Sequence, residues 1–301
     1  MHHMRMERQN DKTTNYSFSI YLLPAVLALP QALMAKETIT WLEATFPPYL
    51  IHQGEYKGQG YGDVVTDILI KHLDQYEHKR MPANISRHYR MYKRGEKVCS
   101  AGLYKKPERE EFLHFSMPSF LTLPNVIVIN KGKYDAFGDT NTVSLATILQ
   151  DKSLIIGQAK NRSYGRIIDN IFEEYVNASN VFAYEGKSLS LNFFQMLKRD
   201  RLDGIIGLPE EVLYQAENLG IRDHIMTLAI EENQQSLDAW LSYVVCSKTP
   251  WGQKVIEDVN KVLRQQRPTE AYRAAYERWL DKASIARYRE AYDKYFLSVT
   301  Q

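Results

Sequence analysis

The chain has little of several things that would narrow its function. It has two cysteines, and its eight histidines are dispersed without the short spacings of a zinc site, so we expect no metal and no other cofactor. The net charge is only +2, with acids and bases interspersed, which argues against a nucleic-acid partner. No strand-like run is followed by GxGxxG, which disfavours two sequential dinucleotide-binding domains.

The first 35 residues have the layout of a secretory signal. A polar segment with Arg5, Arg8 and Lys12 precedes an apolar run at 18–35 that ends in small residues. Two prolines interrupt this run, and it is short for a membrane span, although an uncleaved anchor is the alternative. We place cleavage after Ala35 and expect the remainder to be a soluble exported chain.

The remaining chain alternates short apolar runs with longer stretches of helical spacing. Strands are expected at 38–44, 98–103, 125–130, 154–157, 204–207 and 241–247. Helices are expected at 61–73, 144–149, 163–176, 189–199, 210–219 and 251–264, with two more within 269–296. This alternation indicates an α/β fold with largely parallel sheets.

The most informative stretch is 98–120, VCSAGLYKKPEREEFLHFSMPSF. A buried strand is followed by a polar turn that carries Arg109, and then by the segment FSMP. An arginine just past a strand end is well placed to bind an anion, because its planar guanidinium matches a carboxylate in a bidentate fashion. The alternative is a surface arginine paired with Glu108 or Glu110.

This strand, its PER turn and the FS-x-P segment resemble the first lobe of the family 3 extracellular solute-binding proteins, the periplasmic receptors of amino-acid importers. The resemblance implies the two-lobed type II periplasmic-binding-protein fold, in which each lobe is a mostly parallel sheet flanked by helices and a ligand cleft lies between the lobes. Lobe 1 would comprise 36–124 plus 236–301, and lobe 2 would comprise 125–235. The resemblance also implies that Arg109 holds the ligand's α-carboxylate.

Other stretches extend the resemblance along nearly the whole chain. WLEATFPPYL implies cleft positions for Glu43 and Phe46, with Tyr49 as a further candidate, and IIGQAKNRSYGRII implies that a helix capped by Ser163 offers its N-terminus to the carboxylate. For these aromatic and cap positions, core packing and an ordinary capped surface helix are the alternatives. The candidate ligand-binding residues are Glu43, Phe46, Tyr49, Tyr104, Arg109, Ser163, Tyr164 and Glu210.

One stretch departs from the family pattern. In amino-acid binders the turn after the "G-x-x-D" strand carries an aspartate for the α-ammonium, and here the matching place in GIIGLPEEV reads Leu208-Pro209-Glu210. Either Glu210 substitutes with a shifted geometry, or the ligand lacks an α-ammonium.

The resemblance also bears on the two cysteines. It places Cys99 and Cys246 in neighbouring strands of lobe 1, which makes them a candidate disulfide in an oxidising compartment. The alternative is two buried free thiols.

The function expected from this resemblance is that of a monomeric periplasmic receptor. It would capture a small polar, carboxylate-bearing, amino-acid-like ligand and deliver it to the membrane permease of an ABC-type importer. Two alternatives use the same fold: a ligand-sensing module for a membrane receptor, and a dehydratase-like enzyme. We assign no catalytic residue, because no Ser-His-Asp order or nucleophile elbow is present.

Overall fold

The computed structural model describes residues 1–2 and 35–300, apart from residues 161, 186–187 and 235–236. Lys36–Gln301 form one compact unit, in which the described strands make two sheets, one of five strands and one of six. The predicted signal segment falls mainly on residues outside the described part of the chain and stays a prediction. None of the described helices is long and apolar enough to span a membrane.

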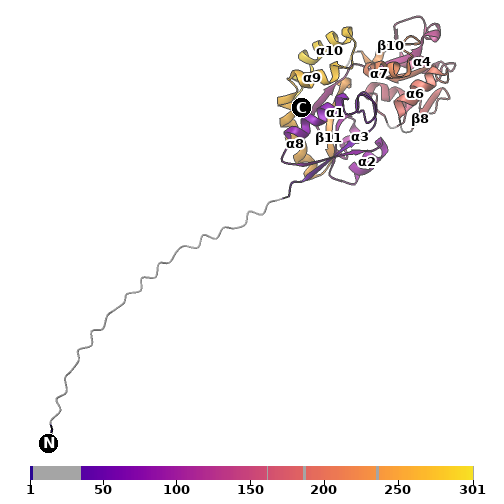
Figure 1. Ribbon diagram of the computed structural model, residues 1–301. Coiled ribbons are helices and arrows are strands. Elements are labelled where there is room, and N and C mark those ends of the chain that lie inside the picture. The colour runs from indigo at the N-terminus through magenta and orange to yellow at the C-terminus, as the bar shows by residue number, and fades with distance from the viewer. Residues whose placement is uncertain (3–34, 161, 186–187, 235–236, 301) are drawn as a thin grey trace. The chain divides into compact units, whose positions relative to one another are not determined.

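Lobe 1 is built around the five-stranded sheet, whose strand order is β2-β1-β3-β11-β4. Its strands and α-helices in chain order are β1 (Thr38–Glu43), α1 (Tyr61–His72), β2 (Glu77–Pro82), α2 (Ile85–Lys93), β3 (Val98–Tyr104), α3 (Pro107–Glu110), β4 (Leu113–Leu121), β11 (Leu241–Ser247), α8 (Pro250–Gln266), α9 (Glu270–Glu277) and α10 (Lys282–Lys294). The first and last parts of the unit therefore share one lobe, and Figure 1 shows the indigo α1 near the yellow α9 and α10.

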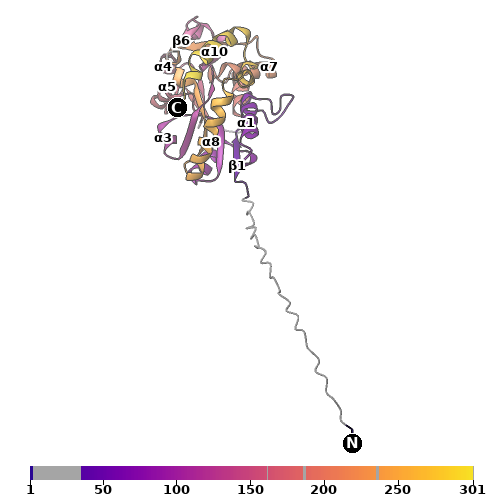
Figure 2. The same ribbon diagram turned by 90° about the vertical axis from the view of Figure 1, so that its left-hand side faces the viewer.

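The helix α8 shows why these residues form a helix that covers the sheet of lobe 1. Thr249 caps it by accepting a hydrogen bond from the backbone N–H of Gly252, and Pro250 occupies the first turn. Its buried side chains, among them Val255, Val259 and Val262, recur at helical spacing and make one apolar face. That face packs against β4 and β11, and Figure 2 shows α8 across the strands.

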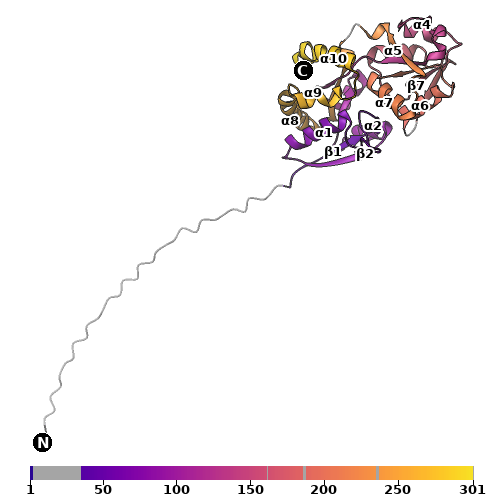
Figure 3. The ribbon, with the colours of Figure 1, turned by 45° about the horizontal axis from the view of Figure 1, so that its top comes forward.

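Lobe 2 is built around the six-stranded sheet, whose order is β6-β10-β5-β9-β7-β8. Its strands and α-helices are β5 (Val126–Asn130), β6 (Thr142–Val143), α4 (Leu145–Gln150), β7 (Ile156–Ala159), α5 (Arg166–Glu174), β8 (Val181–Tyr184), α6 (Leu189–Lys198), β9 (Gly204–Gly207), α7 (Pro209–Leu219) and β10 (Ile225–Ile230). The helices flank the sheet, and Figure 3 shows α4, α5, α6 and α7 around its strands. The apolar residues of these strands and helices form a second hydrophobic core.

The predicted α/β architecture with two sheets flanked by helices is confirmed, and the strands expected from apolar runs are all present as β1, β3, β5, β7, β9 and β11. The sheets are mixed, because β11 runs antiparallel to β3 and β4, and β5 runs antiparallel to β9 and β10. The strands β5 and β11 each follow a link from the other lobe. Neither is reached through a helical crossover from a strand of its own sheet, which is the connection that parallel strands need.

Several strands had no expectation from the sequence. β2 is an edge strand of sequence EHKRMP whose side chains are mostly exposed, so it lacks an apolar run. β8, of sequence VFAY, is a short edge strand in which two of the four side chains are exposed. Apolar runs therefore identified the central strands more completely than the edges.

The chain passes twice between the sheets. The first passage runs from the end of β4 to the start of β5, at 122–125, and the second runs from the end of β10 to the start of β11, at 231–240. We keep the lobe boundaries at 36–124 plus 236–301 and 125–235 as our division of the chain.

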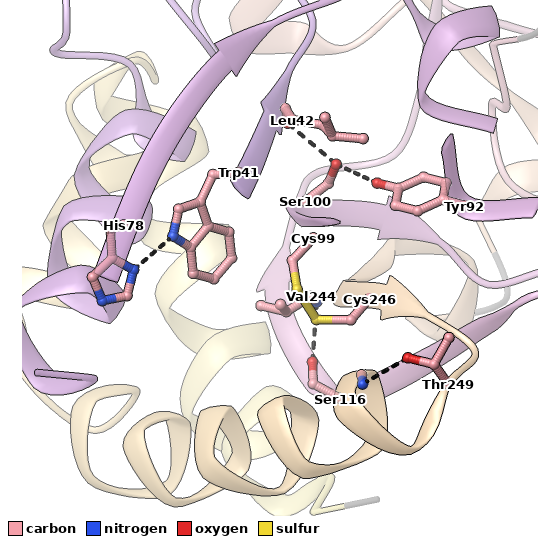
Figure 4. Close-up of a disulfide and its surroundings, with 11 residues drawn as sticks. Trp41, Leu42, His78, Tyr92, Cys99, Ser100, Ser116, Val244, Cys246 and Thr249 are labelled. Carbon is pink, nitrogen blue, oxygen red and sulfur yellow. Dashed lines mark hydrogen bonds between the residues drawn. A yellow bond between two sulfur atoms is a disulfide. The ribbon is translucent and has the colours of Figure 1, made fainter. Parts of the chain in front are cut away.

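The two cysteines are a cross-strand pair in the sheet of lobe 1. Cys99 in β3 lies opposite Cys246 in β11, and their sulfurs form a disulfide with Cα atoms 4.1 Å apart. Both residues are fully buried. Figure 4 shows the bond between the strands, with Ser116 of β4 accepting a hydrogen bond from the N–H of Val244 beside it. The predicted disulfide is confirmed, and the alternative of two free thiols is wrong.

Candidate functional site

A cavity of about 150 Å³ lies where side chains of both lobes meet. It is lined by Leu42, Ala44, Phe46, Tyr49, Leu50, Tyr61, Ile85, His88, Tyr89, Tyr92, Ser100, Gly102, Leu103, Tyr104, Arg109, Thr122, Ser242 of lobe 1 and by Arg162, Ser163 and Leu208 of lobe 2. Many of these residues follow the carboxyl ends of β1, β3, β7 and β9. Ligands of α/β proteins bind at such strand ends, so this cavity is the candidate site.

Arg109 lies in this cavity's lining and is itself buried, with 7% of its surface exposed. The short helix α3, which starts at Pro107, carries it. Its Nη1 donates a hydrogen bond to the carbonyl of Tyr104 at 2.6 Å, and its guanidinium lies over the ring of Tyr89, 5.5 Å from the centroid. Within the described part of the chain, no carboxylate lies within ion-pair distance of Arg109.

The surface alternative for this arginine is therefore wrong. Glu110 forms its ion pair with Lys105 at 2.9 Å, and Glu108 is exposed. Arg109 instead presents a buried cation, held in place by a backbone carbonyl and an aromatic ring, to the cavity. This arrangement suits a ligand that carries an anionic group.

The aromatic residues after β1 form one side of the cavity. Phe46 bridges to Leu50 through backbone hydrogen bonds, and the guanidinium of Arg162 lies 4.3 Å from its ring centroid. The ring of Tyr49 packs against the start of α1. A Cβ atom at Gly62 would come within 2.3 Å of that ring. Glycine at 62 is thus what allows Tyr49 to reach the cavity.

The tyrosines of the lining direct their hydroxyls toward protein partners. The hydroxyl of Tyr92 bonds that of Ser100 at 2.5 Å, and the hydroxyl of Tyr104 bonds that of Thr122 at 3.3 Å. Burial raises the pKa of Tyr104 to about 12, so its hydroxyl stays protonated at neutral pH. These residues offer mainly ring surface to the cavity.

Ser163 lines the cavity, but its predicted role as the cap of the following helix is wrong. The helix α5 starts at Arg166 with Gly165 as its N-cap, at φ 89°. The hydroxyl of Ser163 donates to Asp169 at 2.5 Å, and that carboxylate also accepts the N–H of Tyr164. The hydroxyl of Ser163 therefore binds the buried carboxylate of Asp169 and does not cap the helix.

Arg162, which directly precedes Ser163, also lines the cavity. It forms a bidentate ion pair with Glu211, at 3.1 and 2.7 Å, and Glu211 lies in the first turn of α7. Both residues are largely buried. The pair therefore neutralises the charge of Arg162 inside lobe 2 and positions its guanidinium against Phe46.

Three of the predicted ligand-binding residues lie outside the lining. Glu43 forms ion pairs with Arg80 at 2.7 Å and His52 at 3.2 Å. The hydroxyl of Tyr164 accepts the N–H of Ala159, inside lobe 2. Glu210 accepts hydrogen bonds from tyrosines of lobe 1. The structure thus brings together Phe46, Tyr49, Tyr104, Arg109 and Ser163, and places the other three beside that group.

Glu210 joins the two lobes. This residue of α7 accepts the hydroxyl of Tyr61 at 3.1 Å and that of Tyr276 at 2.8 Å, and only 1% of its surface is exposed. Burial raises the pKa of Glu210 to about 7, although the hydrogen bonds from both tyrosines oppose the rise. A second contact between lobes is the ion pair of Lys106 with Asp169, at 2.7 Å.

The helix α2 supplies cavity residues that the sequence analysis missed. His88 and Tyr92 are spaced by four residues and share a buried face, with Tyr89 beside them. The signal was available, because aromatic residues at this spacing stand out in a helix that is otherwise basic. Burial lowers the pKa of His88 to about 4, so its ring is neutral at pH 7.

The two sheets, the double passage between them and a cavity at the strand ends define the type II periplasmic-binding-protein fold. Solved structures confirm this assignment. An ancestral arginine-binding protein bound to arginine aligns with 82% of this chain and 100% of its own, at a TM-score of 0.63 and 19% identity. A putative L-cystine ABC transporter protein from Listeria monocytogenes aligns over 82% and 97%, at 0.62 and 19%.

A sensor domain has the same fold. A histidine kinase sensor domain with similarity to periplasmic binding proteins aligns with 82% of this chain and 96% of its own, at a TM-score of 0.63 and 13% identity. No family model and no curated protein matches the sequence. At these identities the comparisons establish the fold alone, because one fold serves several functions.

Proposed function

We propose that this chain is the receptor of a small-molecule importer. It captures a small carboxylate-bearing ligand of amino-acid size between its lobes and delivers that ligand to the membrane permease of an ABC-type importer. The observation that carries the proposal is Arg109, a buried cation at the cavity with no carboxylate partner among the described residues. The likeness in fold to amino-acid-binding proteins supports it.

The proposal includes the location and the contacts. The chain is exported by a signal cleaved after Ala35 and acts in the periplasm as a monomer. The residues that contact the ligand are Phe46, Tyr49, Tyr104, Arg109 and Ser163. Glu43, Tyr164 and Glu210 do not contact the ligand and instead hold neighbouring parts of the protein in place.

Thermal unfolding of the chain from Lys36 onward, against amino acids and small carboxylates, tests this proposal. A ligand at about 100 times its dissociation constant stabilises the folded state by about 2.7 kcal/mol, which raises the midpoint clearly. Arg109→Gln should abolish the shift. Arg90→Gln, which removes an exposed arginine from α2, should not. An equal shift in the Arg109 variant contradicts the proposal.

The similarity to a histidine kinase sensor domain favours a second candidate, ligand sensing for a membrane receptor. The cavity and Arg109 would serve both functions, so ligand binding does not separate them. Binding assays with the closed, liganded chain separate them by partner. Capture of a transport permease supports import, and capture of a receptor ectodomain supports sensing.

A further inference from the structure

The charged groups of the cavity have one sign. Among the described residues that line it are two arginines and one histidine, but no aspartate or glutamate. The charge of Arg162 is compensated by Glu211, and the ring of His88 is neutral at pH 7. Arg109 therefore leaves one uncompensated positive charge, which one negative charge of a ligand would balance.

Carboxylates beside this site are already held by other partners. Asp169 binds Lys106 and the hydroxyl of Ser163. Glu210 accepts hydrogen bonds from two tyrosines. An ammonium group in the cavity would be repelled by the positive charge of Arg109. It would also find no free carboxylate to accept its hydrogen bonds, which is unfavourable in a buried site.

The rest of the lining offers apolar surface. The hydroxyls of Tyr61, Tyr92 and Tyr104 have protein partners, as described above. Leucines and an isoleucine line it at positions 42, 50, 85, 103 and 208, and the other lining residues without a ring or a charge are Ala44, Gly102, Ser100, Thr122, Ser163 and Ser242. A cavity of about 150 Å³ favours a small ligand.

We propose that the ligand of this cavity is a small monocarboxylate with a compact, uncharged, apolar or aromatic body and no ammonium group. The carboxylate binds the free N–H groups of Arg109, and the body packs among the tyrosine and phenylalanine rings. This inference rests on the proposed receptor function and narrows its ligand class.

A quaternary ammonium held by an aromatic cage is the competing chemistry, since several rings line the cavity. However, two of the ring faces already hold cations: the guanidinium of Arg109 lies over Tyr89, and that of Arg162 lies over Phe46. Tyr49 and Tyr61 pack against each other with centroids 5.1 Å apart. The rings of Tyr89 and Phe46 are therefore not available to form a cage around a second cation.

Calorimetric titration of the chain from Lys36 onward with matched pairs tests the inference. Phenylacetate and phenylglycine differ only by an α-ammonium, as do isovalerate and valine, and benzamide lacks the charge of benzoate. We expect at least one of the free acids to bind tenfold or more tightly than its amino counterpart. We also expect benzoate to bind more tightly than benzamide. Arg109→Gln should weaken the binding of the preferred acid tenfold or more.

Leu208 allows the converse experiment. It is buried, lines the cavity and occupies the N-cap position of α7, where aspartate and asparagine are both accepted. Leu208→Asp places a carboxylate beside the ligand, and the ratio of affinities should shift at least tenfold toward the amino-bearing partner. Leu208→Asn, which has the same shape without the charge, should leave the preference for the free acid.

Three results would overturn the inference. If phenylglycine or valine binds the unaltered chain as tightly as its free acid, in an Arg109-dependent manner, the receptor function stands and the ligand class is wrong. If glycine betaine binds more tightly than every free acid, the receptor function likewise stands and the proposed ligand class is wrong. If neither these acids, nor amino acids, nor betaine bind, the receptor proposal fails together with the inference.

Discussion

Arg109 is held by contacts that only an arginine makes at this position. One N–H group is used by the carbonyl of Tyr104, the guanidinium plane faces the ring of Tyr89, and further N–H groups remain for a ligand. Lysine has a single ammonium group, which cannot bond the carbonyl and a carboxylate with the same geometry. The charge alone is therefore insufficient for the proposed role.

Arg109→Lys should consequently weaken ligand binding about tenfold or more, although the net charge is unchanged. Isothermal titration with the ligand found by the panel measures this effect. The conservative change Arg90→Lys on the exposed face of α2 is the control and should leave the affinity unaltered. Equal affinity of the Arg109→Lys variant would mean that any cation at this position suffices.

Glu210 gives the chain a specific pH dependence. Its pKa in the folded state is about 7, above the ordinary value of 4.5, because burial disfavours the carboxylate. The unfolded chain then loses this proton at lower pH than the folded chain does. The free energy of unfolding should fall by on the order of 3 kcal/mol as the pH rises from about 4.5 to about 7. Above that range the contribution of Glu210 no longer changes with pH.

Glu210→Gln should remove that fall, because a glutamine keeps hydrogen-bonding atoms for Tyr61 and Tyr276 and does not ionise. Urea unfolding at pH 4.5, 5.5 and 7.5 in both proteins measures the difference. A variant whose stability changes with pH in parallel with that of the unaltered chain would contradict the raised pKa.

Single positions were predicted unevenly from the sequence. Arg109, Phe46 and Tyr49 follow the carboxyl ends of strands, where ligands of α/β proteins bind, and the family resemblance placed them in the cleft. Glu43 is the last residue of β1, and its side chain points to Arg80 of the neighbouring strand β2. Because β2 is a polar edge strand without a sequence signal, neither the strand nor this ion pair could be foreseen.

Among the elements, the β3–β11 pair holds the middle of lobe 1 and carries the disulfide. The two cysteines are separated by 147 positions, so the bond closes a long loop in the unfolded chain. On the chain-entropy model such a loop contributes about 5 kcal/mol to stability. The double change Cys99→Ala and Cys246→Ala should lower the free energy of unfolding by about 2–5 kcal/mol.

Denaturant unfolding of the oxidised chain, the reduced chain and the double variant tests this value. Reduction should give a loss similar to that of the double variant, and the variant should not respond to reductant. If the reduced and oxidised chains unfold at the same denaturant concentration, the bond does not stabilise the lobe.

The start of α1 is the element that positions Tyr49. Gly62→Ala would place a methyl group within 2.3 Å of the Tyr49 ring and 2.8 Å of its carbonyl, so the ring must move. We expect a loss of about 1–3 kcal/mol in stability and weaker ligand binding. Gly132→Ala is the matched control, since its nearest neighbour lies 3.8 Å away, and it should have little effect on either quantity.

At the level of the whole molecule, the lobes meet through a few contacts outside the cavity. Tyr276 donates its hydroxyl to Glu210 across the lobes and does not line the cavity. Tyr276→Phe should therefore reduce ligand affinity about fivefold, because the loss of its hydrogen bond to Glu210, about 1 kcal/mol, makes the closed state less populated. The change also removes the acceptor of the Leu123 N–H within lobe 1, which lowers stability.

The control for this change is Tyr272→Phe. The hydroxyl of Tyr272 donates to the carbonyl of Ser119 within lobe 1, at 2.7 Å, so its removal should lower stability without lowering affinity. Titration calorimetry and small-angle scattering measure affinity and lobe closure on the same samples. Equal affinity of the two variants would show that the contact at Glu210 plays no part in closure.

The α/β class was predictable from the alternation of apolar strands and amphipathic helices, which is a local pattern, and the division into two lobes was predictable through the family resemblance. The charge balance of the cavity was not predictable, because it depends on which basic residue or hydroxyl each acidic side chain contacts in the folded chain. Glu211, which neutralises Arg162, comes directly after Glu210, and nothing in the local sequence separates their roles.

The place of β11 in the sheet of lobe 1 has a consequence for the order of assembly. A chain leaves the ribosome or a secretion channel from its first residue to its last, and lobe 2 is contiguous, so all its strands emerge before β11 does. Among the described strands, β4 pairs only with β11. Lobe 1 therefore stays open, with Cys99 still a thiol, until nearly the whole chain has emerged, whereas lobe 2 can close earlier.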